Sequence, residues 1–244
     1  PGVRAIRKLI RNVGADVIQI NGMENPQGAI AGRLEGIGVV GQFHGLGMPW
    51  PVRLAMSMFG RTFADAVMVP GTGLTRYFPG LRSVGSRLSS WTPPVDPAAF
   101  DPELFDGDSV KAELGISRTA PVVGTVGNIN PAKGYDSFLK TASLVRSRRP
   151  DSRFVIVGHV PASQQRLFGR LKRQAENLGL HLGEDLVITE ARDGTARLLS
   201  SFDVYVQSSV AEGTSTSLLE AMSMGKAVVA TDVGQTGEVV GNEE

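Results

Sequence analysis

The sequence predicts an α/β fold built from parallel sheets that are covered by helices. Short apolar segments alternate along the chain with stretches whose apolar residues recur at helical spacing. Such alternation implies right-handed crossovers between parallel strands. Glycine is frequent, with 30 of 244 residues, as many turns between strands and helices require. The length alone allows one or two domains.

The composition excludes several classes of protein. The net charge is +1, so nothing global indicates a nucleic-acid partner. The absence of cysteine excludes disulfides, thiolate metal sites and cysteine nucleophiles, and agrees with a reducing cytoplasm. No apolar stretch approaches the roughly 18 residues of a membrane-spanning helix, and no signal peptide is visible. The chain starts without Met inside a helical pattern, so we expect a fragment of a longer protein.

The first helix is expected at residues 3–13, with an apolar stripe and a basic opposite face. It is either a surface helix packed on a sheet or a peripheral contact with an anionic membrane surface, so the predicted location is the cytoplasm or the inner membrane surface. The elements expected after it are strands at 16–20, 38–43 and 66–69, and helices at 27–34, 52–63 and 73–78.

His44 follows the strand at 38–43 directly and is flanked by glycines. Ligands in open α/β sheets bind at the carboxyl ends of strands, so this position favours a functional histidine. A turn residue bonded to backbone is the equally weighted alternative.

A proline-rich linker is expected at residues 89–107, since Pro93, Pro94 and Pro97 fall within five residues and make a stiff, non-helical connection. We place the boundary near Gly107, giving domains at 1–107 and 108–244. The residues Asp106 to Asp108 spell a D-x-D metal motif, but no strand precedes them, so no metal site is expected there.

The second domain is expected to hold strands at 121–126, 153–158, 186–189 and 204–206, a buried strand at 226–231, and helices at 136–148 and 164–178. Gly127 to Gly134 form the turn after the first of these strands. The turn lacks the P-loop pattern, so a Walker site is rejected. Lys133 is either a point charge for a diphosphate or an exposed turn lysine. His159 also follows a strand and is expected to be a turn residue.

The loop at residues 208–216 joins a strand to a helix that Gly225 would end. Free N–H groups at the helix start favour an anion such as phosphate, and Gly213 allows close approach of backbone to a ligand. Hydroxyls come from Thr214, Ser215 and Thr216. A carboxylate would accept hydrogen bonds from sugar hydroxyls. Phosphate and sugar together predict a nucleotide-sugar.

Two carboxylates, Glu212 and Glu220, flank this loop with the spacing E-x7-E. Each has a structural alternative. Glu220 could close a capping box with Ser217, and Glu212 could be a solvated loop residue.

The block at 206–238 resembles the signature of the retaining glycosyltransferases of family four, which have the GT-B fold. The resemblance implies two Rossmann-like domains, both incomplete in this chain, with the donor in the cleft between them. It implies that Glu212 lies by the donor sugar and that Glu220 binds the ribose. The run at 15–45 resembles the second half of the family's first domain, where a histidine at the position of His44 points at the donor sugar. Asn21 stands where the family often has a histidine.

The turn after residue 126 resembles the family's G-R-x-x-x-x-K-G element, in which Arg and Lys clamp the donor phosphates. Gly127 and Lys133 match this element, whereas Asn128 stands at the Arg position, so one charge of the clamp is missing. Arg192 lies in a segment that loosely resembles one lining the nucleotide site.

The resemblance implies transfer of a hexose from a nucleotide diphosphate sugar to an acceptor hydroxyl with retained configuration. It implies no metal and no cofactor, and an acceptor that is a glycan or a lipid-linked molecule. The alternatives are a sugar-nucleotide epimerase of the same fold and a non-catalytic nucleotide-sugar-binding fragment. A glycosidase is disfavoured, because eight residues of continuous helix span about 12 Å, more than the roughly 5–9.5 Å between paired catalytic carboxyls.

Overall fold

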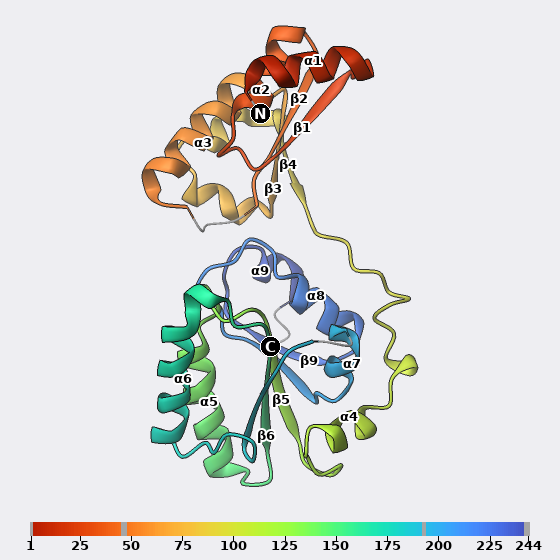
Figure 1. The fold of residues 1–244 in the computed structure, drawn as a ribbon, viewed down its shortest axis with the longest axis vertical. Coiled ribbons are helices and arrows are strands. Elements are labelled where there is room, and N and C mark those ends of the chain that lie inside the picture. Colours follow the sequence, from red (N-terminus) through yellow and green to blue (C-terminus); the bar gives the residue numbers. More distant parts are fainter. Residues whose placement is uncertain (1, 45–47, 192–193, 242–244) are drawn as a thin grey trace. The chain divides into compact units, whose positions relative to one another are not determined.

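A computed structural model describes residues 2–44, 48–191 and 194–241 of the chain. Its contacts divide the chain into two compact units (Figure 1). Unit 1 contains residues 1–93, 211–214 and 232–244, and unit 2 contains residues 94–210 and 215–231. The chain thus leaves unit 1 after Pro93, before the predicted boundary near Gly107, and later returns to it twice.

Unit 1 is built on a four-stranded parallel sheet with the order β1-β2-β3-β4. Its strands are β1 (Val17–Asn21), β2 (Gly38–Gln42), β3 (Ala66–Pro70) and β4 (Leu88–Trp91). Its helices are α1 (Val3–Val13), α2 (Gln27–Glu35), α3 (Trp50–Phe63), the 3-10 helices η1 (Thr72–Tyr77) and η2 (Leu81–Arg87), and α9 (Thr236–Val239). Buried side chains of the strands and of α3, such as Val39, Val67 and Met56, form one core with Phe43 and Phe78.

Two arginines on the basic face of α1 form ion pairs with a glutamate of α2. Arg7 Nε lies 2.5 Å from Glu35 Oε1, and Arg11 Nε lies 2.6 Å from Glu35 Oε2. Hydrogen bonds from Arg11 and then Arg7 lower the pKa of Glu35 to about 2. The helix ends at Gly14, whose φ of 62° is the left-handed conformation that glycine adopts easily. These contacts account for α1 as a helix packed within unit 1.

Unit 2 is built on a five-stranded parallel sheet with the order β7-β6-β5-β8-β9. Its strands are β5 (Val122–Val126), β6 (Arg153–Val157), β7 (Leu186–Thr189), β8 (Val204–Gln207) and β9 (Ala227–Ala230). Its α-helices are α4 (Gly107–Glu113), α5 (Tyr135–Arg148), α6 (Gln165–Asn177), α7 (Thr195–Ser200) and α8 (Thr216–Ser223). Three short 3-10 helices, η3 (Pro102–Leu104), η4 (Pro131–Lys133) and η5 (Ala162–Gln164), complete it.

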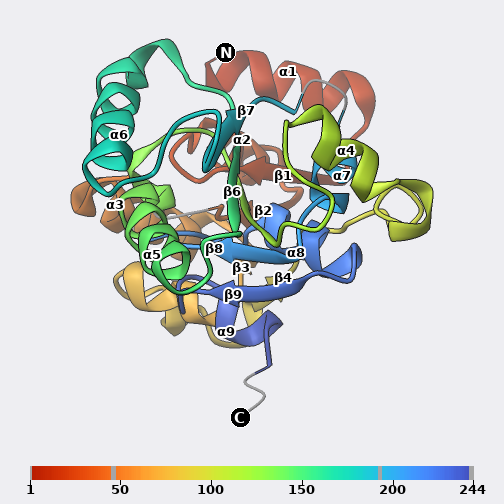
Figure 2. The ribbon, with the colours of Figure 1, turned by 90° about the horizontal axis from the view of Figure 1, so that it is seen from below.

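The strand order of unit 2 creates a topological switch point. From β5 the chain moves outward through β6 and β7, and then returns to place β8 on the other side of β5. Helices α5 and α6 cover one face of the sheet, and α4, α7 and α8 cover the other (Figures 1 and 2). Ligands of doubly wound sheets bind outside the carboxyl ends of the strands at such a point.

The structure corrects one predicted element, and it adds elements in the expected linker. The segment 226–231 was predicted to be a buried strand, but Val229 in β9 is 59% exposed, because β9 is an edge strand that pairs only with β8. The expected linker contains β4, which pairs with β3, and α4 follows it. Asp106 caps α4 and accepts a hydrogen bond from the Asp108 N–H, so capping accounts for one carboxylate of the D-x-D sequence.

Within the described ranges, no helix is both long and apolar enough to cross a membrane.

Candidate functional site

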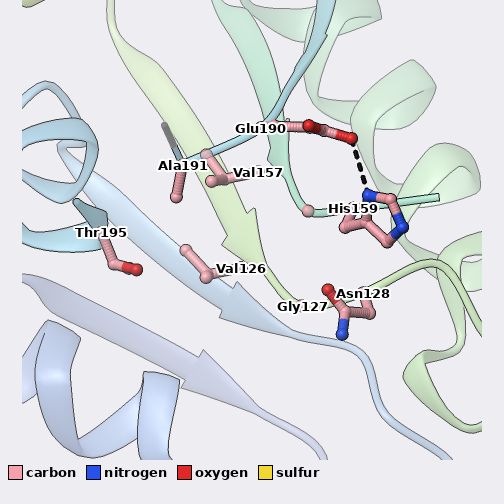
Figure 3. Close-up of a pocket in the computed structure, with 9 residues that line it drawn as sticks. Val126, Gly127, Asn128, Val157, His159, Glu190, Ala191 and Thr195 are labelled. Atoms are coloured by element: carbon pink, nitrogen blue, oxygen red, sulfur yellow. Dashed lines mark hydrogen bonds and ion pairs between the residues drawn. The ribbon is translucent and has the colours of Figure 1, made fainter. Parts of the chain in front are cut away.

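A cavity of about 290 Å³ opens at the carboxyl ends of β5, β6 and β7, beside the switch point of unit 2 (Figure 3). It is lined by Val126, Gly127, Asn128, Val157, Gly158, His159, Glu190, Ala191 and Thr195. Its volume lies just below the range of about 300–1,000 Å³ that is typical of ligand pockets, so it suits a single ring system or a nucleoside.

Two glycines bring the loops after β5 and β6 together below this cavity. A methyl group on Gly158 would lie 1.9 Å from the carbonyl oxygen of Gly127, so only glycine fits there. The Gly127 N–H donates to the Val157 carbonyl at 2.8 Å, and the Ile129 N–H donates to the His159 carbonyl at 2.9 Å. The Tyr135 hydroxyl donates to the Gly127 carbonyl. The two loops are therefore fixed relative to each other.

Lys133 ends the short helix η4 beside the cavity. Its side chain lies over Gly127, because a methyl group built on that glycine would be 2.7 Å from the lysine Cε. Its carbonyl accepts a hydrogen bond from Ser208 Oγ at 3.0 Å, which ties the turn to the end of β8. Gly134 follows with a φ of 63° and packs against the Ser208 carbonyl. The lysine is thus held between the loops that follow the two central strands.

Asn128, the residue at the expected Arg position, is exposed and lines the cavity. Its carbonyl accepts a hydrogen bond from Asn130 Nδ2 at 3.1 Å. Its side chain is a neutral amide, which can donate or accept hydrogen bonds but adds no positive charge.

The structure adds a histidine–carboxylate pair to the site. His159 Nδ1 lies 2.8 Å from Glu190 Oε1, and both side chains line the cavity. From the sequence, His159 was expected to be a turn residue, and the Glu190 side chain was not singled out. A usable signal was present, since Glu190 directly follows β7 and His159 follows β6 after one residue, and β6 and β7 are neighbours in the sheet. Arg192, the other candidate here, lies outside the described residues.

Glu220 lies within α8 and takes no part in capping it. The N-cap is Ser215, whose hydroxyl accepts from the Leu218 N–H at 3.4 Å. The Ser217 hydroxyl instead donates to the Val126 carbonyl at 3.1 Å and contacts the Tyr205 hydroxyl at 2.9 Å. The capping-box interpretation of Ser217 and Glu220 is therefore wrong.

The carboxylate of Glu220 is half-buried, and burial raises its pKa above the ordinary value. No hydrogen bond or ion pair joins it to another side chain that the structure describes. A half-buried carboxylate in this state is ready to accept hydrogen bonds from a ligand. Thr216 at the start of α8 is exposed.

The other half of the predicted site lies in unit 1, where His44 and the segment 211–214 meet. A methyl group on Gly213 would lie 2.2 Å from the His44 carbonyl, so this glycine permits close approach of two backbone segments. The Gly213 carbonyl accepts from the Gln235 N–H at 2.9 Å, and Thr214 Oγ1 donates to Gln235 Oε1 at 2.5 Å. The backbone of Glu212 is thus held near His44.

The imidazole of His44 is exposed and packs edge-to-face against Trp91 at the end of β4, with ring centroids 5.9 Å apart. Trp91 was not singled out from the sequence. Aromatic contact of this kind restrains a ring's orientation. In unit 1 the strand ends thus present an oriented imidazole. In unit 2 they present a cavity with Lys133 beside it, and helix α8 carries a half-buried carboxylate.

The second half of the chain matches a known family. The model for "Glycosyl transferases group 1" covers residues 120–244, which is more than half of the chain. The chain belongs to this family. It is 29% identical over 180 residues to the D-inositol 3-phosphate glycosyltransferase of Rhodococcus erythropolis, covering 73% of this chain and 35% of that protein. It is 29% identical over 152 residues to the lipopolysaccharide core biosynthesis mannosyltransferase LpsB of Rhizobium meliloti, covering 62% of this chain and 42% of that protein.

The fold also matches solved structures. The crystal structure of HepE from Anabaena in complex with UDP superposes with a TM-score of 0.82 at 20% identity, over 98% of this chain and 65% of that chain. Such a match shows the fold. It confirms the GT-B architecture expected from the sequence, for the part of that fold that this chain spans. The chain spans 35% to 42% of the length of the curated relatives named above.

Proposed function

We propose that the protein transfers a hexose from a nucleotide diphosphate sugar to an acceptor hydroxyl, with retention of the anomeric configuration. The observation that carries this proposal is the switch point of unit 2, where a cavity of nucleoside size lies beside Lys133. The family match over the same unit supports it, as do the UDP and UDP-glucose complexes of the structurally similar HepE.

Unit 2 holds the nucleoside diphosphate in this proposal. The base enters the cavity, and Lys133 neutralises the diphosphate as a point charge. The Gly127 N–H is already bonded to the Val157 carbonyl, so the Asn128 N–H is the donor of this loop that faces the phosphates in this scheme. Packing of Gly158 against Gly127 fixes the loop, so the phosphates meet a preformed surface. The half-buried Glu220 carboxylate accepts hydrogen bonds from the ribose diol, and these bonds offset the burial that raises its pKa in the free protein.

His44 and Glu212 of unit 1 act on the hexose. The bond between the anomeric carbon and the diphosphate oxygen breaks, a bond to the acceptor oxygen forms, and the acceptor proton leaves with the diphosphate. The sugar carries positive charge in the transition state. The carboxylate of Glu212 and the carbonyl or imidazole of His44 therefore lower the barrier when they lie near it. No metal is required in this scheme, since Lys133 and the Asn128 N–H offset the charge of the leaving group.

Analysis of reaction products tests the proposal. The full-length protein is incubated with nucleotide diphosphate sugars and a mixture of glycan and lipid-linked acceptors, and products are identified by mass spectrometry and NMR. The expected result is a glycoside with the donor's anomeric configuration, released together with nucleoside diphosphate. An inverted glycoside removes the retaining mechanism. An epimerised nucleotide-sugar without glycoside, or binding without any product, replaces the proposal with an epimerase or a binding protein.

A further inference from the structure

The cavity of unit 2 has one apolar side and one polar side. The side chains of Val126, Val157 and Ala191 lie together, and the pair of His159 and Glu190 lies on the other side (Figure 3). A flat aromatic ring gains most from apolar contact with its faces and hydrogen bonds at its edge. The arrangement therefore suits a nucleobase whose edge is read by Glu190.

His159 fixes how the carboxylate of Glu190 is presented. An ionised carboxylate only accepts hydrogen bonds, so the His159 Nδ1 at 2.8 Å from Oε1 must carry the proton and donate it. This leaves Oε2 and one lone pair of Oε1 for a ligand. The side chain of Glu190 is 46% exposed and that of His159 is 63% exposed, so a ligand in the cavity can reach them.

A carboxylate offers two coplanar acceptors, and the four common bases differ in how they match it. Guanine carries two neighbouring N–H donors on one edge, N1–H and the 2-amino group, which together satisfy both oxygens. Uracil has a single N–H between two carbonyl oxygens, and these would oppose the carboxylate. Adenine and cytosine place an acceptor nitrogen beside their amino group, which again opposes one oxygen.

We infer that the Glu190 carboxylate, oriented by His159, reads the edge of guanine and makes the protein selective for a guanosine diphosphate sugar. The inference rests on the proposed function and names the donor class for it. Glu190 is a specificity-determining residue in this scheme, and His159 is a positioning residue that acts through it.

Calorimetric titration of the wild-type chain with GDP, IDP, UDP and ADP tests the inference directly. IDP differs from GDP only by lacking the 2-amino group, so it removes one of the two donors that meet Glu190. A hydrogen bond to a charged group stabilises by about 1.5–3 kcal/mol, and the pair is half-exposed, so GDP should bind about tenfold more tightly than IDP. UDP and ADP should bind more weakly still.

The variant Glu190→Gln replaces one acceptor by an amide donor. It should lose the preference for GDP over IDP, and it should bind xanthosine diphosphate more tightly than the wild type does, because xanthine has a carbonyl where guanine has its amino group. His159→Ala should reduce the GDP preference only in part. Glu184→Gln, an exposed change in the same unit, is the matched control and should keep the wild-type order.

The outcomes separate the two proposals. Equal binding of GDP and IDP by the wild type, or tighter binding of UDP or ADP, overturns guanine recognition and leaves a nucleotide-sugar transferase. Binding of none of the four diphosphates overturns the proposed function itself. The wild-type comparison requires no variant, so a Glu190→Gln protein that fails to fold does not remove the test.

Discussion

Two glutamates, Glu212 and Glu220, stand eight residues apart in the sequence but belong to different folding units and different local structures. Glu212 belongs to the segment of unit 1 whose backbone packs at His44, and Glu220 belongs to helix α8 of unit 2. Glu220 is half-buried with a pKa raised by that burial. The comparison teaches that one sequence signature can supply residues to two folding units. The roles proposed for the two residues differ accordingly, with chemistry on the sugar for Glu212 and binding of the nucleotide for Glu220.

The largest effect is expected from Glu212→Gln. If this carboxylate stabilises the positively charged sugar, turnover in the full-length protein should fall about a hundredfold or more. Affinity for nucleoside diphosphate should not change, because the contact belongs to the sugar. Steady-state kinetics and calorimetric titration measure the two quantities, with the exposed Glu103→Gln as control. Normal turnover by Glu212→Gln would remove the catalytic role and, with it, the contrast between the two glutamates.

Lys133→Ala tests the positive charge that unit 2 contributes to the proposed diphosphate site. Loss of a charge-assisted contact with the diphosphate should weaken nucleoside diphosphate binding about tenfold or more, and free nucleoside binding much less. Lys140→Ala changes an exposed lysine on α5 and should leave both affinities as they are. If Lys133→Ala reduces both affinities equally and slightly, Lys133 is a surface lysine and unit 2 binds the phosphates by other groups.

Glu220→Gln tests the nucleotide-binding role proposed for the second glutamate. Affinity for ribonucleoside diphosphates should fall about fivefold, and affinity for their dideoxy analogues should not, because only the diol contacts Glu220. Since Glu220 is not part of the helix cap, the melting temperature should barely change. Glu176→Gln on α6 is the control. A drop in melting temperature of several degrees with unchanged affinities would make Glu220 a structural residue.

The raised pKa of Glu220 adds a dependence on pH to the same measurement. The diol donates to the ionised carboxylate, so the preference for ribose over dideoxyribose is full above the raised pKa. It should decline as the pH falls through that pKa, at a higher pH than an ordinary glutamate would show. In Glu220→Gln the preference should be small and independent of pH. A flat profile in the wild type would argue against contact with the diol.

The smallest effect is expected from removing divalent metal. The part of the chain that the structure describes has no cluster of His, Asp or Glu side chains able to hold an ion. Nucleoside diphosphate affinity should therefore be the same with and without EDTA in the titration. A large loss with EDTA would mean that a metal, rather than Lys133, offsets the charge of the diphosphate.

Much of the fold could be predicted because local periodicity reports which face of an element is buried. The stripe from Val3 to Val13 and the apolar run at 121–126 appear as α1 and β5 with bounds close to those expected. Strand β4 was missed because its four residues are followed after one residue by Pro93 and Pro94, which indicate a connection. The exposure of β9 could not be predicted, because the apolar sequence pattern of a strand does not distinguish an edge strand from a central one.

The sequence by itself determined the parallel α/β construction, the spacing of Glu212 and Glu220, and the position of Lys133 after β5, since each depends on residues close together in the chain. Only the tertiary structure decided the strand order, the partner of Ser217 and the pairing of His159 with Glu190. Ser217 bonds a carbonyl 91 residues away, and His159 and Glu190 are 31 residues apart. Contacts of this kind depend on how strands are ordered in the sheet, and local pattern carries no information about that order.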